Sequence, residues 1–282
     1  RGRTLMPGLI DAHWHSTFTA LSHADMTAPD ASPEKLAATV ATESARTLMR
    51  GFTSVRDAGG PIFELKAAID AGKVPGPRIW PSGDFVSQTS GHGDLRQPHE
   101  RSRRFFGKPS MAEEMGATFI ADGRDEVLTA VRENLRMGAS QIKLMAGGGT
   151  SSAYDPVDVT QYTFDEMRAA VEAAEDWGTY VMVHAYTTRA VRRAIEAGVK
   201  CIEHGQLLDE DTLKLMAERG IWLSTQTLRP STEAMDPMRR EKRKPVIEGQ
   251  ARTIAAAKRA GVRMGWGTDF LFDPALNVEQ NA

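Results

Sequence analysis

The sequence contains little cysteine, no long apolar run and no strong excess of either charge, and each shortage excludes a class of protein. Cys201 is the only cysteine among the 282 residues, which excludes an internal disulfide and a metal cluster built from several thiolates of one chain. No apolar stretch approaches the ~18–20 residues needed to cross a bilayer. The formal net charge of −2 points to no polyanionic partner. We therefore expect a protein that binds neither nucleic acid nor membrane.

The remaining composition is that of an ordinary globular protein. Apolar residues make up 41% and charged residues 26% of the chain, and its length suffices for one large domain with a substantial core. A single cysteine suits a reducing compartment, and no signal peptide is visible. We therefore expect a cytoplasmic location.

Short apolar runs alternate with amphipathic helical patterns along the whole chain. The expected strands lie at 5–13, 52–58, 78–86, 141–146, 180–185, 200–205, 221–226 and 262–269. The expected helices lie at 33–50, 61–72, 124–138, 164–177, 188–197, 209–219 and 247–260. Several strand candidates are almost continuously apolar, which is typical of buried parallel strands. Asp209 can cap the helix over 209–219, and Gly220 can end it.

Eight alternations of this kind predict a (β/α)8 TIM barrel that spans residues 1–282. A doubly wound open sheet is the alternative, but it often carries a glycine-rich first turn, and no G-x-G-x-x-G follows the first expected strand. The longest irregular region, 87–123, is rich in Gly, Pro and Arg. A loop of that length is usually functional or mobile.

Two histidines close the first expected strand, in "PGLIDAHWH" at 7–15. Because side chains alternate along a strand, His13 and His15 point the same way, and Trp14 points away. At the carboxyl end of a barrel strand that shared side is the mouth, where active sites of barrels lie. Two imidazoles there can hold a metal ion, although H-x-H alone is weak support, because many such pairs are simply packed or solvated.

Other strands carry residues of the same chemical type at the same relative place. His184 ends "YVMVHA", His204 ends "CIEHG", and Asp269 ends "GWGTD", although the chain has only seven histidines. Lys143 lies within the otherwise apolar "QIKLMA". Core packing explains one or two such residues but explains the whole set poorly. We expect these side chains to meet at the barrel mouth.

Lys143 is open to three interpretations on the residues alone. Its ammonium can reach solvent from a strand end, or it can be an amine base whose pKa burial lowers. It can also be carboxylated by CO2, which gives a carboxylate able to bridge two metal ions. The sequence does not choose among the three.

These motifs together resemble the amidohydrolase superfamily, over nearly the whole chain and in the order of all the ligand motifs. Within it, "VSQTSGHGDLR" (86–96), "QIKLMAGGGTSS" (141–152), "HAYT" (184–187) and "CIEHGQLLDED" (201–211) are similar to the branch of binuclear Xaa-Pro dipeptidase-like carboxypeptidases. Amidases that cleave aryl-acyl amino acids such as ochratoxin are close to that branch.

The resemblance implies a site for two divalent metal ions, expected to be zinc, with these ligands: His13, His15, Lys143, His184, His204 and Asp269. The first two histidines and Asp269 would bind the more buried ion, and His184 and His204 the second. Carboxylated Lys143 and a hydroxide would bridge the pair. The absence of sulfur from this set agrees with a site that makes a nucleophile at neutral pH. Asp269 would pass the proton to the leaving amine.

The resemblance also implies residues that contact the substrate. His92, in "SGHGD" of the long loop, would contact a substrate carbonyl or carboxylate, although a histidine between glycines is often only exposed. Tyr186 shares a face with His184, so its phenol would polarise the scissile carbonyl or pack at the rim. Three arginines are further candidates for a substrate carboxylate: Arg96, Arg101 and Arg229. The two remaining loop histidines are expected to be bystanders: His23 and His99.

The sequence departs from the family pattern at both ends. Members carry a small β-sandwich built from segments on either side of the barrel, and a last barrel helix. This sequence opens at the first strand and stops soon after the eighth, so these parts are expected to be absent from the chain.

We therefore expect an amidohydrolase that cleaves the amide bond of a dipeptide or an N-acyl amino acid, including ochratoxin-type substrates. The expected partners are that small-molecule substrate and further copies of the chain in a homo-oligomer. A cyclic amidohydrolase such as an imidazolonepropionase is the alternative, but those relatives use one metal and need no strand lysine. A non-catalytic barrel scaffold is the third possibility, although such proteins lose metal ligands.

Overall fold

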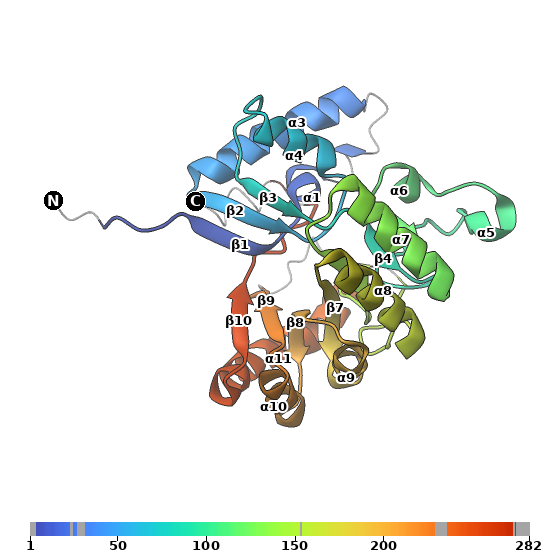
Figure 1. Cartoon of the computed structure of the whole chain (residues 1–282), viewed down its shortest axis with the longest axis vertical. Helices are drawn as coiled ribbons and strands as arrows, with labels where there is room; N and C mark the ends of the chain where they lie inside the picture. The colour runs from blue at the N-terminus through green and yellow to red at the C-terminus, as the bar shows by residue number, and fades with distance from the viewer. Residues whose placement is uncertain are drawn as a thin grey trace.

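Parallel strands alternate with helices along the chain, and the helices lie on the outer side of the strands (Figure 1). The computed structural model describes residues 4–22, 25–26, 32–152, 154–228, 236–272 and 274. The strands are β1 (Leu9–Trp14), β2 (Phe52–Asp57), β3 (Arg78–Pro81), β4 (Phe85–Ser87), β5 (Thr118–Ile120), β6 (Ile142–Met145), β7 (Val181–Thr187), β8 (Cys201–Leu207), β9 (Trp222–Thr225) and β10 (Arg263–Trp266). The helices are α1 (Ser16–Ala20), α3 (Pro33–Met49), α4 (Phe63–Asp70), α5 (Arg103–Phe106), α6 (Met111–Glu114), α7 (Arg124–Met137), α8 (Phe164–Trp177), α9 (Thr188–Ala197), α10 (Glu210–Glu218) and α11 (Pro237–Ala260).

The strands form the predicted (β/α)8 barrel from two parallel ladders. One ladder has the order β1-β2-β3, and the other has the order β10-β9-β8-β7-β6-β4-β5. β10 lies beside β1. The two strands are so close that a Cβ atom added at Gly265 would lie 3.6 Å from Cβ of Ala12. Beyond β10, the backbone N–H of Asp269 donates to the carbonyl of His13 over 2.9 Å. The carboxyl ends of the parallel strands therefore meet at one end of the molecule.

Two stretches differ from the sequence prediction. The single strand expected over 78–86 is divided into β3 and β4 by a bend at Ser82–Asp84. The region 87–123, expected to be irregular, contains α5, α6 and β5, and β5 pairs with β4 at the edge of the larger ladder. Each of these elements has only three or four residues, which is too short to show a hydrophobic period.

Local signals set most helix ends. Asp209 accepts a hydrogen bond from the N–H of Thr212 and begins α10, as its position predicts. α11 is longer than expected and runs through Pro245, a residue that argues against a helix interior when only the sequence is read. No helix within the described ranges is both long and apolar enough to cross a membrane.

The largest apolar cluster lies between the strands from β4 to β9 and the helices packed on them. β6 and β7 are buried almost throughout, as expected for strands covered on both sides. α8 contributes a row of small buried side chains, which lets the helix approach the strands closely: Ala169, Ala170, Ala173 and Ala174. This core holds the strand ends in fixed positions.

The bend between β3 and β4 depends on one buried amide. Asn134 of α7 accepts from the N–H of Asp84 over 3.0 Å and donates to its carbonyl over 2.9 Å. Gly83 adopts φ +75°, and a Cβ there would lie 2.3 Å from Oδ1 of Asn134. The side chain of Asn134 thus replaces the strand neighbour that the backbone of Asp84 lacks.

We expect Asn134→Ala to lower the free energy of unfolding by about 2–4 kcal/mol, because two buried backbone groups would lose their partners. Urea denaturation monitored by circular dichroism measures this change. Arg132→Ala, at an exposed position of the same helix, serves as the control and should change stability by less than ~0.5 kcal/mol. Equal stability of the two variants would show that the amide does not support the bend.

Candidate metal centre

The carboxyl end of β1 presents two imidazoles to the inside of the barrel. His13 and His15 are both buried, and their rings lie 5.2 Å apart. Trp14, between them, points the other way and packs with Val55 and Ile79. The alternation of a strand thus places both histidines on the side of the barrel mouth.

Asp269 comes to these histidines from the segment that follows β10. Its Oδ1 lies 3.4 Å from Nε2 of His13 and 3.3 Å from Nε2 of His15. Two ligands of a tetrahedral zinc ion, each bound at about 2.0–2.1 Å, lie roughly 3.3–3.4 Å from one another. The three side chains therefore have the mutual spacing that a single ion requires, and their ligand atoms all lie within 4.8 Å of one another.

Asp11 fastens β1 to the segment that carries Asp269. Its carboxylate accepts from the N–H of His13 and from both the N–H and the hydroxyl of Thr268. Burial raises the pKa of Asp11 to about 7, against these hydrogen bonds. Sequence reading gave this residue no role, although an acid within the apolar run "GLIDA" was a usable signal.

A second group of aromatic side chains comes from β7 and β8. The ring of His204 lies 4.4 Å from that of His184 and 4.9 Å from that of His13. Nδ1 of His204 lies 3.9 Å from Oδ2 of Asp269. This nitrogen is buried and has no hydrogen-bond partner among the residues that the structure describes. A buried ring nitrogen of this kind fits a metal ligand. Tyr186 completes the group, with its ring 5.0 Å from His184 and 5.2 Å from His204.

Hydrogen-bond acceptors fix where three of the imidazoles carry their protons. Nδ1 of His13 lies 2.6 Å from Glu203, and Nδ1 of His15 lies 2.9 Å from the carbonyl of Gly59. Nε2 of His184 lies 3.1 Å from the carbonyl of Gly148. Because carbonyl and carboxylate oxygens only accept, each of these nitrogens is the donor. The opposite ring nitrogen is then free to bind a cation.

Lys143 projects from β6 into the same space. Its side chain is 1% exposed, and Nζ lies 3.4 Å from Nε2 of His13. Burial lowers the pKa of Lys143 to about 8, although nearby Glu203 and Asp269 oppose the change. Burial also lowers the pKa of His13 to about 4. Burial thus shifts both groups towards their neutral forms.

His92 reaches the cluster from the long loop. Its ring stacks on that of His184 with the centroids 4.1 Å apart, and its Nδ1 lies 2.8 Å from Oγ of Ser152 and 3.6 Å from Asp155. Ser152 and Asp155 also line a cavity of about 360 Å³ that opens beside the cluster. The sequence gave no signal for Asp155, because it lies in a loop without a motif.

The other expected substrate contacts are not brought to the cluster. Arg96 is paired with Asp94 through two hydrogen bonds and lines the cavity. Arg101 also lines the cavity, where its guanidinium lies 4.0 Å from the ring centre of Phe106. Arg229 lies outside the described residues. Of the two expected bystanders, His99 is exposed and His23 lies outside the described residues.

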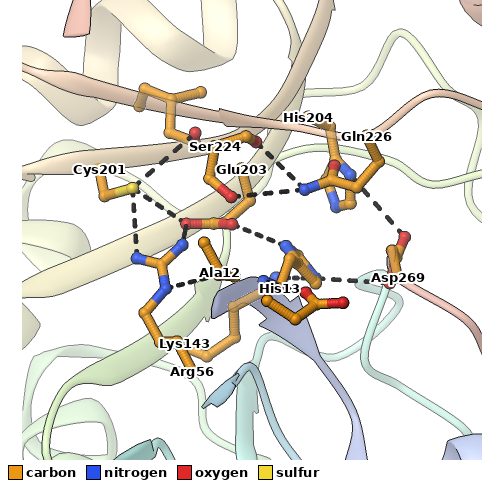
Figure 2. Close-up of polar contacts among 12 residues, drawn as sticks. Ala12, His13, Arg56, Lys143, Cys201, Glu203, His204, Ser224, Gln226 and Asp269 are labelled. Atoms are coloured by element: carbon orange, nitrogen blue, oxygen red, sulfur yellow. Dashed lines mark hydrogen bonds and ion pairs between the residues drawn. The ribbon is translucent and has the colours of Figure 1, made fainter. Parts of the chain in front are cut away.

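Sequence reading missed a buried charged group behind His13. Figure 2 shows His13 between Asp269 on one side and Glu203 on the other, with Arg56 and Cys201 beyond Glu203. Arg56 pairs with Glu203 over 2.6 Å. Burial opposes the charge of Glu203, but Arg56 and the hydrogen bond from His13 hold its pKa well below the ordinary range. The available signal was charge within strand patterns, in "SVRDA" and "CIEHG".

The arrangement brings nitrogen and oxygen donors together and excludes sulfur. Cys201 donates to Glu203 over 3.0 Å, on the far side from the cluster, and burial raises its pKa to about 12. Imidazole and carboxylate donors without thiolates suit a hydrolytic zinc site. The residues present therefore fit divalent metal ions.

Comparisons with known proteins agree with this chemistry. The model of the amidohydrolase family matches residues 4–278. Ochratoxinase from Aspergillus niger is 33% identical over 276 residues, which cover 94% of this chain and 58% of that protein. This chain therefore spans a little over half the length of the curated relative.

Solved structures with the same fold include two peptidases. A prolidase complexed with N-methylphosphonate-L-proline superposes with a TM-score of 0.86 and 40% identity, covering 96% of this chain and 67% of the prolidase. A Xaa-Pro dipeptidase with bound methionine superposes with a TM-score of 0.81 and 30% identity, covering 98% of this chain and 70% of the other.

We expect His15→Ala to weaken zinc binding by more than the ~10–100-fold typical of losing only a ligand's hydrogen-bond partner. Competition with a chromophoric zinc chelator measures the affinity, and elemental analysis gives the number of ions per chain. His99→Ala removes an exposed imidazole from the long loop and should bind zinc as the unaltered chain does. Equal affinities in the two variants would exclude His15 as a ligand.

Proposed function

This chain belongs to the amidohydrolase family, and we propose that it is a metal-dependent hydrolase that cleaves the amide bond of a dipeptide or an N-acyl amino acid. The observation that carries the proposal is the group of four buried histidines and buried Lys143, with partly exposed Asp269, at the carboxyl ends of the strands. The similarity to ochratoxinase and to prolidases supports the choice of an amide substrate.

We assign two divalent ions, expected to be zinc, to this group. His13, His15 and Asp269 would hold one ion, because their ligand atoms have the spacing described above. His184 and His204 would hold the second, and carboxylated Lys143 would lie between the two. When bound, such ions activate water at neutral pH and polarise a carbonyl oxygen.

Asp269 is the proposed carrier of the proton. Its side chain is 15% exposed, whereas those of His13 and His15 are 1% and 3% exposed, so it would be the member of the three that a substrate reaches first. Burial raises the pKa of Asp269, but its interactions with His13, His15 and His204 outweigh burial and hold that pKa below its ordinary value. Oδ2 of Asp269 can accept a proton from the attacking water and return it to the nitrogen of the leaving amine.

Tyr186 and His92 would bind the substrate beside the ions. Burial raises the pKa of Tyr186, so its hydroxyl stays protonated and can donate to the carbonyl oxygen as negative charge develops there. His92 is held at Nδ1 by Ser152, and its Nε2 lies 3.5 Å from Oγ of Ser151, a long contact that a substrate carbonyl or carboxylate would replace. The neighbouring cavity, with Arg96 and Arg101 in its wall, would take the more distant part of the substrate.

A substrate panel tests the proposal. Zinc-loaded protein is incubated with Xaa-Pro dipeptides, other dipeptides, N-acyl amino acids and aryl-acyl amino acids, and the released amine is measured by mass spectrometry. We expect at least one class to be hydrolysed, with activity lost on removing the metal and restored on adding zinc. Zinc binding without hydrolysis of any member would contradict the substrate class, and absence of zinc binding would contradict the metal centre.

Asp269→Asn should lower kcat by about 10²–10⁴-fold while most of the metal stays bound, because asparagine offers an oxygen ligand but cannot carry a proton. Metal content from elemental analysis is measured beside kcat on the same preparation. Near-normal turnover in this variant would show that another group moves the proton.

We expect Lys143 to be carboxylated in the active protein. An ammonium buried against His13 and two bound cations is unfavourable, whereas a neutral amine can capture CO2 and give a carboxylate that ligates both. Labelling with carbon-13 bicarbonate should give a carbamate signal that Lys143→Met loses together with activity. Lys143→Ala should regain some activity with a short carboxylic acid. An unmodified Lys143 in fully metallated, active protein would refute the bridge.

A further inference from the structure

The guanidinium of Arg56 ties three strands together beneath the metal centre. Its Nε donates to the carbonyl of Ala12 over 2.6 Å, and its Nη2 donates to Oε1 of Glu203 over 2.6 Å. Nη1 lies 3.4 Å from both Sγ of Cys201 and the hydroxyl of Tyr180. One side chain from β2 therefore contacts the backbone beside His13 on β1 and the carboxylate on β8.

Glu203 divides its two oxygens between different partners. Oε1 accepts from Arg56 and from Cys201 over 2.6 and 3.0 Å, and Oε2 accepts from Nδ1 of His13 over 2.6 Å. The carboxylate is fully buried. The donors at Oε1 therefore set the orientation of the carboxylate, and Oε2 faces His13 (Figure 2).

The backbone of β8 makes this contact possible. Glu203 and His204 are consecutive, so a regular strand would send their side chains to opposite faces. His204 instead adopts φ 78°, in the left-handed region that a residue with a Cβ seldom occupies. Both side chains then lie against His13: Glu203 at Nδ1, and His204 with its ring 4.9 Å away.

We propose that the buried Arg56–Glu203 ion pair is a positioning device that holds the proton of His13 on Nδ1 and presents Nε2 as the metal-binding nitrogen. This inference rests on the proposed function, in which His13 is a ligand. Stability alone is a poor explanation for the pair, because a buried ion pair rarely stabilises a protein more than apolar residues of similar volume. A fixed imidazole is what the geometry provides.

The orientation of the carboxylate leads to a sharp expectation for Glu203→Gln. The amide oxygen of glutamine takes the place of Oε1, because Arg56 and Cys201 both donate there. The amide NH2 then faces Nδ1 of His13, which must become an acceptor. The proton of His13 moves to Nε2, the nitrogen that binds the ion. A change of one atom thus reverses the tautomer while the volume of the side chain is kept.

Two measurements on the full chain test the inference. Long-range proton–nitrogen-15 correlation spectra of histidine-labelled, metal-free protein report which ring nitrogen of His13 is protonated, with the signal assigned by its loss in His13→Ala. Zinc affinity is measured by chelator competition. We expect Glu203→Gln to carry the proton on Nε2 and to bind zinc about 10- to 100-fold more weakly.

Glu43→Gln is the matched control. Glu43 on α3 accepts from Arg50 over the same 2.6 Å and is also buried, but neither residue contacts the metal centre in the described structure. This variant should keep the tautomer and the zinc affinity of the unaltered chain. Arg56→Lys keeps the positive charge but cannot hold Ala12, Glu203 and Cys201 together. It should keep the Nδ1 proton and lose less affinity than Glu203→Gln, which gives a second test if Glu203→Gln does not fold.

The outcomes separate this inference from the proposed function. If Glu203→Gln folds, either of two results would overturn the positioning role: the proton of His13 stays on Nδ1, or the zinc affinity lies within twofold of that of the unaltered chain. If Glu203→Gln does not fold, zinc affinity of Arg56→Lys equal to that of the unaltered chain would overturn it. If the unaltered chain binds no zinc, the proposed function fails, and the spectra still show whether Glu203 fixes the proton.

Discussion

The cost of burying charge at the mouth of the barrel governs how the surrounding strands are built. Lys143 and Glu203 are 1% and 0% exposed, and an unpaired ion at such depth costs several kcal/mol. Hydrogen bonds offset this cost: the imidazoles of His13 and His15 donate to acceptors behind them, and Arg56 donates to Glu203. Donor atoms are thereby aimed inward, so the proposed ions would find ligands already in place and would need little reorganisation of the protein.

Backbone strain adds a second energetic cost at the barrel mouth. His204 and Asp269 adopt φ 78° and 54°, although neither is glycine, and such conformations cost of order 1–3 kcal/mol each. At His204 this conformation lets two consecutive side chains face His13. At Asp269 it accompanies the hydrogen bond by which the chain after β10 returns to β1. Among the described residues, two of the five non-glycine residues with positive φ are therefore ones to which we assign metal binding.

The proposed metal ligands and the proposed substrate contacts occupy different parts of the fold. The proposed ligands come from the ends of strands that a large apolar core holds rigid. His92, Asp155 and the wall of the cavity come from loops. Loops can change without disturbing the core. This division agrees with the similarity to both ochratoxinase and prolidases, whose names give different substrates.

The sequence by itself determined the alternation of strands and helices and the residues that stand at strand ends, because both follow from local periodicity. It therefore predicted the barrel and the shared direction of His13 and His15. The divided strand at 78–86 and β5 escaped prediction because elements of three or four residues show no period. Only the tertiary structure decided the Arg56–Glu203 pair, whose members are 147 residues apart. No local pattern can reveal a contact that exists only because the closing barrel brings β2 and β8 together.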